Sequence, residues 1–162
     1  PQPQTTIAAA LPLGCSSRCE IIDMRLEQHI PLNGLRETLQ QTMPSGIQVL
    51  EVDQVDERGP ALQTQVVSAE YEVSGIETGF GSELKRTIDS VMGSESISRT
   101  RRGKEYDLRP LIESLRLTPE GKIFMCLAAR EGATGRPEEV LDALGIAFEE
   151  TRIERIRLNL QS

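Results

Sequence analysis

Aromatic side chains are scarce in this sequence of 162 residues, which has three phenylalanines, two tyrosines and no tryptophan. A chain of this length buries about two-thirds of its unfolded surface, so it needs no disulfide or structural metal to stay folded. Because so few aromatic residues are available, this core must be aliphatic. The shortage of rings also argues against a row of stacking aromatics of the kind that reads single-stranded RNA.

Histidine and cysteine are also rare. His29 is the only histidine, so this chain alone cannot assemble a histidine-based metal site or a Ser-His-Asp triad. Cys15 and Cys19 match the first two ligands of the C-x3-C-x2-C pattern of a radical-SAM iron–sulfur cluster, but Ile22 holds the third position. We interpret these two cysteines and Cys126 as core or incidental residues. The sequence predicts no catalytic residue and no metal ligand.

Long apolar runs and a basic leader are missing as well. The longest apolar stretch, residues 6–13, is far shorter than the roughly 20 residues of a membrane helix, and no basic residue precedes it. An odd number of cysteines favours a reducing compartment. We therefore expect a cytoplasmic location and no membrane partner. Because the first residue is Pro rather than Met, we also expect a fragment of a longer polypeptide.

The net charge of −7 is unevenly distributed. Residues 1–95 hold 6 basic and 14 acidic side chains, a net of −8, whereas residues 96–162 hold 12 and 11, a net of +1. An acidic protein is not a general nucleic-acid binder, because non-specific affinity comes from many cations that neutralise phosphates. A local basic segment can still contact phosphates, but we expect no DNA partner.

The first part of the chain predicts a β-β-α-β order. Alternating or continuous apolar residues indicate a hairpin of strands at 5–13 and 18–26 and another strand at 47–55, and leucines spaced by three and four predict a helix from Pro31 to Met43. Gly59-Pro60 then marks a boundary. We predict a partial ferredoxin-like subdomain over residues 1–58.

The second part predicts β-α-β-β-α-β with an insertion. Strands are expected at 64–74, 108–117, 122–130 and 151–160, with helices at 82–93 and from Pro137 to Leu144. In the last strand Ile156, Leu158 and Leu160 are expected on the inner side. We predict an α+β fold of ferredoxin-like (split βαβ) units, the second over residues 64–162 with an inserted basic β-arm at about 96–118, and the first incomplete at its N-terminus.

The basic β-arm is the densest local feature. Gly103 allows a turn that points neighbouring cations at one object, and arginine forks suit bidentate phosphate contacts. Thr134-Gly135-Arg136-Pro137 adds a helix start beside an arginine. The equally weighted alternative is a solvated arm whose cations pair with the acidic first half. The candidate substrate-binding or RNA-binding residues are Arg99, Arg101, Arg102, Lys104, Arg109 and Arg136.

Five motifs together resemble one bacterial family: LPLG at 11–14, EIIDMRL at 20–26, AEYEV at 69–73, KEYDLRP at 104–110 and RPEEVLDAL at 136–144. This is the radical SAM-linked protein family, a domain found beside, or fused to the C-terminal end of, cobalamin-binding-type radical SAM proteins. In that family a basic strand and helix precede the first strand of this chain.

The resemblance implies a bacterial parent or partner enzyme that uses a [4Fe-4S] cluster and S-adenosylmethionine, with cobalamin left open, and no cofactor in this segment. Family members are encoded near an E/G-type ribonuclease and ribosomal proteins, which suggests RNA by association only. Our first hypothesis is a non-catalytic accessory or C-terminal domain that positions structured RNA, such as tRNA or rRNA, for modification. The alternative is a protein-interaction domain that docks onto the radical SAM core.

Overall fold

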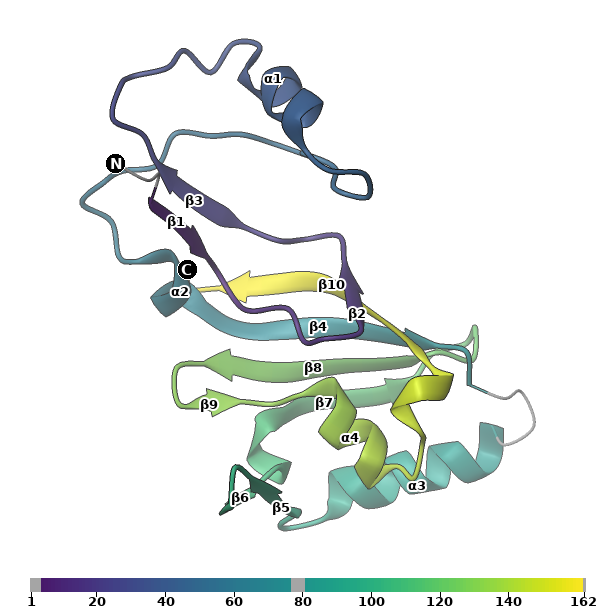
Figure 1. Ribbon diagram of the computed structural model, residues 1–162. Coiled ribbons are helices and arrows are strands. Elements are labelled where there is room, and N and C mark those ends of the chain that lie inside the picture. The colour runs from purple at the N-terminus through teal and green to yellow at the C-terminus, as the bar shows by residue number, and fades with distance from the viewer. Residues whose placement is uncertain (1–3, 77–80, 162) are drawn as a thin grey trace.

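Helices and strands both contribute to the fold, which is described here over residues 4–76 and 81–161 of a computed structural model (Figure 1). The predicted α+β class is confirmed. The first three residues of the subdomain predicted at 1–58 lie outside the described residues. The elements are β1 (Gln4–Ile7), β2 (Cys15–Ser17), β3 (Ile22–Arg25), α1 (Leu35–Thr42), α2 (Leu62–Gln65), β4 (Val66–Ser74), α3 (Gly81–Gly93), β5 (Ser98–Arg101), β6 (Lys104–Asp107), η1 (Arg109–Leu111), β7 (Ile112–Leu117), β8 (Ile123–Arg130), β9 (Ala133–Thr134), α4 (Pro137–Ala143), η2 (Phe148–Glu150) and β10 (Arg152–Leu160).

The main sheet has the strand order β2-β10-β4-β8-β7, and β9 pairs with β8. Its strands are antiparallel except that β2 runs parallel to β10. Apart from β5, β6 and β9, the elements from β4 to β10 follow the predicted order β-α-β-β-α-β. Assignment of the two units to the ferredoxin-like class stays a prediction.

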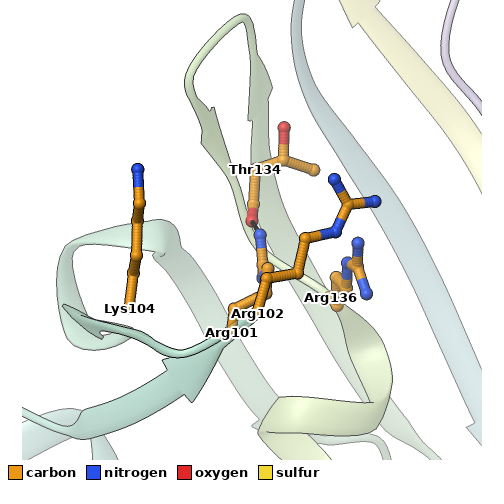
Figure 2. A pocket seen from close by; sticks show the side chains of 5 residues that line it. All are labelled: Arg101, Arg102, Lys104, Thr134 and Arg136. Carbon is orange, nitrogen blue, oxygen red and sulfur yellow. Dashed lines mark hydrogen bonds between the residues drawn. The ribbon is translucent and has the colours of Figure 1, made fainter.

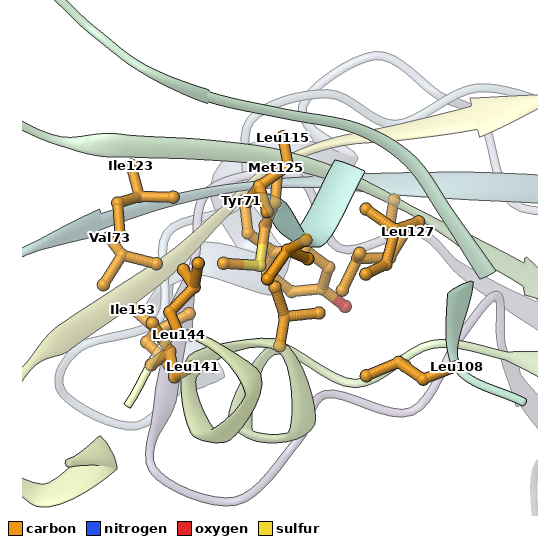
Figure 3. Close-up of a cluster of buried hydrophobic side chains, with 14 of the residues drawn as sticks. Tyr71, Val73, Leu108, Leu115, Ile123, Met125, Leu127, Leu141, Leu144 and Ile153 are labelled. Atoms are coloured by element: carbon orange, nitrogen blue, oxygen red, sulfur yellow. The ribbon is translucent and has the colours of Figure 1, made fainter. Parts of the chain in front are cut away.

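Alternation along the central strands creates the core. Every second residue of β8, from Ile123 to Leu127, is buried, as expected for a strand with one face on a core. Helices α3 and α4 lie on one side of the sheet (Figure 1) and bury Ile88 and Val140 among other residues. Figure 3 shows the resulting cluster, in which Tyr71 is the only ring with less than a tenth of its surface exposed among the described residues. The core is aliphatic, as its composition predicts.

The first part of the chain differs from its prediction. The predicted hairpin exists, because β1 pairs with β3, but its strands are shorter than the predicted 5–13 and 18–26. The predicted loop between them contains β2, which joins the main sheet beside β10. The chain is not a strand between Arg18 and Ile21, where the backbone N–H of Arg18 donates to the carbonyl of Arg155. One segment of the first predicted unit therefore belongs to the sheet of the second.

The predicted strand at 47–55 is wrong: the structure has no strand in these residues. The Gln40 side chain of α1 donates to the carbonyl of Ile47 (3.0 Å) and accepts from the N–H of Val49 (2.7 Å). These backbone groups are therefore bound to a side chain rather than to a neighbouring strand, and the segment remains irregular. The predicted helix at 31–43 is shorter than expected, since α1 begins at Leu35.

The predicted inner face of β10 is also partly wrong. Ile153, Arg155 and Leu158 are buried, whereas Leu160 is exposed. The register against β4 shifts between Arg155 and Arg157, so the strand changes its alternation there. An arginine is accommodated on the inner face because Glu20 neutralises it.

Candidate functional site

The basic β-arm is a short hairpin formed by β5 and β6. Arg101 pairs with Lys104 across a two-residue turn. Arg102 and Gly103 have positive φ angles of 51° and 76°, as both central residues of a type I′ turn must. The turn places Arg102 and Lys104, both exposed, at the tip of the hairpin.

Arg101 anchors this hairpin to the rest of the protein. Its guanidinium donates two hydrogen bonds to Glu139 of α4 (3.0 and 2.5 Å) and one to the carbonyl of Thr134 (3.1 Å). It also lies 4.7 Å from the centre of the Tyr106 ring. Arg101 is therefore neutralised by Glu139 and positions the hairpin rather than supplying free charge.

Tyr106 belongs to the same polar cluster. Its hydroxyl accepts a hydrogen bond from Arg101 (3.3 Å). Burial, together with the nearby Glu139 carboxylate, raises the pKa of Tyr106 to about 12, although Arg101 opposes the shift. The phenol therefore stays neutral at physiological pH.

Next to this anchor lies an open pocket of about 440 Å³. In Figure 2 the Lys104 side chain stands apart from the other cationic groups of the lining. Among the residues that the structure describes, Arg102 and Lys104 have no ion pair, and Arg136 has only a long one of 3.7 Å with Glu138. The pocket thus combines one neutralised cation with three that are available to an anion. Its lining is Arg101, Arg102, Lys104, Thr134 and Arg136.

Two predicted site residues lie outside this pocket. Arg99 pairs with Asp142 of α4 (3.2 Å). Arg109 donates from Nε and Nη2 to the carbonyl of Met92 (3.1 and 2.8 Å) near the end of α3, and from Nη1 to that of Ile112 (3.0 Å). Arg109 therefore satisfies the Met92 carbonyl at the end of α3, which lacks a helical partner, and its bond to Ile112 connects α3 to β7.

The alternative prediction, that cations of the arm pair with the acidic first half of the chain, is wrong for the two arm arginines that form ion pairs. Arg99 and Arg101 pair with Asp142 and Glu139, both on α4, and not with the acidic first half. Glu139 and Tyr106 also belong to the cluster, although neither was predicted from the sequence. No local pattern reveals the contact between Arg101 and Glu139, because the two residues are 38 positions apart. In addition, an acidic residue in the first turn of a helix is already explained by its favourable interaction with the helix dipole.

The described residues contain no group of three or more histidine, cysteine or acidic side chains arranged to hold a metal ion. Burial raises the pKa of the Cys15 and Cys126 thiols, which keeps them protonated. In residues 4–76 and 81–161, no helix has the length and apolar character needed to cross a bilayer.

Comparison with known families gives a match over residues 1–137, to a family described as "Uncharacterized protein conserved in bacteria (DUF2344)". Searches of curated proteins and of solved structures gave no match. The matched range includes the first predicted unit, residues 64–137 of the second and the whole β5–β6 hairpin, but it ends at the start of α4, before the Glu139 that anchors that hairpin.

Proposed function

The chain belongs to this bacterial family, and we propose that it is a non-catalytic module that binds the phosphates of structured RNA and positions that RNA for a radical SAM enzyme. The observation that supports RNA binding is that Arg102, Lys104 and Arg136 all line one open pocket. Hydrogen bonds from cationic groups to phosphate oxygens are among the stronger polar contacts in proteins.

The charge distribution supports a local contact. A net charge of −7 disfavours RNA binding by the protein as a whole, so binding depends on places where cations without carboxylate partners lie together, as Arg102 and Lys104 do. Their number sets the salt dependence of binding, since each neutralised phosphate releases condensed counterions. We therefore expect a small salt slope that reports on this pocket.

The enzymatic part of the proposal is supported by the resemblance to radical SAM-linked proteins. On this proposal the [4Fe-4S] cluster, S-adenosylmethionine and any cobalamin belong to the parent or partner enzyme. This segment would supply substrate binding from its own residues.

The proposal is tested by removing both hairpin-tip cations in Arg102→Ala/Lys104→Ala and measuring the affinity for labelled bacterial tRNA over a range of salt concentrations. Each lost contact is worth about 1.5 kcal/mol, so the affinity should fall about a hundredfold. The slope of log K against log salt should become shallower by about 1.4 to 1.8, at about 0.7 per contact in single strands and about 0.9 in duplexes.

The matched control is Lys85→Ala/Arg86→Ala, which removes the same charge from the exposed surface of α3. This variant should keep the slope of the unmodified protein. An unchanged slope in the hairpin variant, or an equal change in the control, would refute RNA binding at this pocket.

A second candidate function is docking onto the radical SAM core, and a different observation favours it. Large apolar side chains are exposed in the first part of the chain, and α1 has no buried residue although its leucines lie on one face. The acidity of residues 1–95 means that a fitting partner surface would be apolar and basic. The exposed residues are Ile7, Leu11, Leu13, Ile22, Met24, Leu26, Ile30, Leu32, Ile47, Leu50 and Val55.

A further inference from the structure

A second hollow of about 230 Å³ adjoins the cationic pocket. Both hollows are lined by Arg101, Lys104 and Thr134. Because three residues from β5, β6 and β9 are shared, the two hollows are neighbouring parts of one groove. Beyond the shared residues, Arg102 and Arg136 line one end, and Tyr106, Leu111 and Gly132 line the other.

The two ends of this groove differ in charge. Arg102 and Arg136 make the first end cationic, whereas the lining of the second end beyond the shared residues has no charged side chain. Glu139 already neutralises the shared Arg101. An exposed carboxylate, Glu131, precedes Gly132 in the chain and disfavours a second phosphate there.

The second end has the chemistry of a site for a flat, uncharged ring. Tyr106 contributes the face of its ring that Arg101 does not cover, and Leu111, half-buried in η1, contributes an apolar surface. Gly132 leaves space, since a Cβ built at this position would meet nothing within 4 Å. Bases that bind proteins outside a duplex are held by such aromatic and apolar contacts.

We propose that the groove binds one unpaired nucleotide, with its phosphate at Arg102, Lys104 and Arg136 and its base in the hollow lined by Tyr106, Leu111 and Gly132. This inference rests on the proposed RNA binding and specifies its substrate class as a nucleotide outside a duplex. A single base site of this kind needs one ring, which agrees with the scarcity of aromatics.

The test compares four probes by competition: a single-stranded RNA oligonucleotide, the same oligonucleotide with abasic positions, its blunt duplex, and inorganic polyphosphate. The single strand should bind about tenfold more tightly than the abasic strand and the duplex, because one base–aromatic contact is lost in each.

Two variants test whether the preference for the single strand over the abasic strand arises in the second hollow. Gly132→Asn should remove the tenfold preference by filling the hollow while keeping polyphosphate binding, and asparagine tolerates the φ of +75° at this position. Leu111→Ala should weaken the preference without adding bulk, and Leu160→Ala, the same change at an exposed leucine of β10 outside both hollows, is the matched control that should retain it. If Gly132→Asn does not fold, Leu111→Ala and the abasic strand still decide the question.

The outcomes separate this inference from the proposed function. The base site would be overturned, and phosphate binding left intact, by equal affinities for the single strand, the abasic strand and the duplex, if the slope of log K against log salt matched that measured with tRNA. Absence of binding to all four probes would overturn both.

Discussion

At the scale of single residues, Arg155 joins the two parts of the chain. Its side chain is 1% exposed, and it donates to Glu20 (2.9 and 2.6 Å) and to the carbonyls of Ala9 (2.9 Å) and Ala10 (3.3 Å). Burial alone would lower the pKa of this guanidinium, but the hydrogen bonds and charge of Glu20 raise it. The charge is thus retained in the core because residues 9–20 supply every one of these partners.

Replacing this arginine with an apolar residue of similar length should therefore be costly. Arg155→Met leaves the Glu20 carboxylate and two carbonyls without donors, so we expect the free energy of unfolding in urea to fall by about 3 kcal/mol. Arg157→Met, an exposed position on the same strand, should change it by less than about 0.5 kcal/mol. Equal losses in the two variants would mean that the buried contacts contribute no specific stability.

At the scale of elements, the β5–β6 hairpin keeps an arginine where the backbone disfavours one. Arg102 is the only non-glycine with a positive φ among the described residues. A left-handed conformation costs an ordinary L-residue about 1 kcal/mol, and asparagine or glycine usually occupies this turn position. The presence of an arginine at this strained position is consistent with a role for its side chain in binding.

Stability and binding should therefore change in opposite directions in Arg102→Asn. Relief of the turn should raise the free energy of unfolding by up to about 0.5 kcal/mol, while loss of one cation should weaken tRNA binding about tenfold. Lys104→Asn removes a cation without relieving a positive φ, so it should weaken binding with no gain in stability. Destabilisation by Arg102→Asn would show instead that the arginine side chain holds the turn.

At the scale of the whole molecule, exposed apolar side chains are unevenly distributed. Among the described residues, every large hydrophobic side chain of high exposure lies between Ile7 and Val55, apart from Leu160. The main sheet and its two helices bury their apolar faces, whereas the hairpin of β1 and β3, helix α1 and the irregular segment that follows do not. This uneven distribution supports the second proposed function, docking through residues 7–55.

Docking onto a radical SAM core should depend on this surface. Leu50→Ser/Val55→Ser changes two side chains that are 61% and 63% exposed, so the free energy of unfolding should change by less than about 0.5 kcal/mol. Co-purification with the tagged core should decrease at least about tenfold, because buried apolar contacts are lost. Leu160→Ser, on β10, is the control that should still co-purify, and full co-purification of the double variant would contradict docking through this segment.

Local patterns were sufficient where one face of an element meets the core. Alternation predicts β4 and β8, and the spacing of Leu84, Ile88 and Val91 predicts α3. The same reasoning fails at 47–55, where apolar residues occur without a partner strand, and at Arg155, whose burial depends on Glu20. The pocket was partly predictable, since Arg101, Arg102, Lys104 and Arg136 were all named, but the roles of Arg99 and Arg109 were not.

Composition and periodicity alone determined that this protein has an aliphatic α+β core and a basic hairpin in an otherwise acidic chain, because these properties depend on residue type and short-range spacing. Only the tertiary structure decided which cations remain free. Glu139 and Asp142 approach Arg101 and Arg99 when α4 packs beside the hairpin. The Arg109 guanidinium instead donates hydrogen bonds to the carbonyl of Met92. Charge neutralisation requires contacts within a few ångströms, and here folding brings together residues that are far apart in sequence.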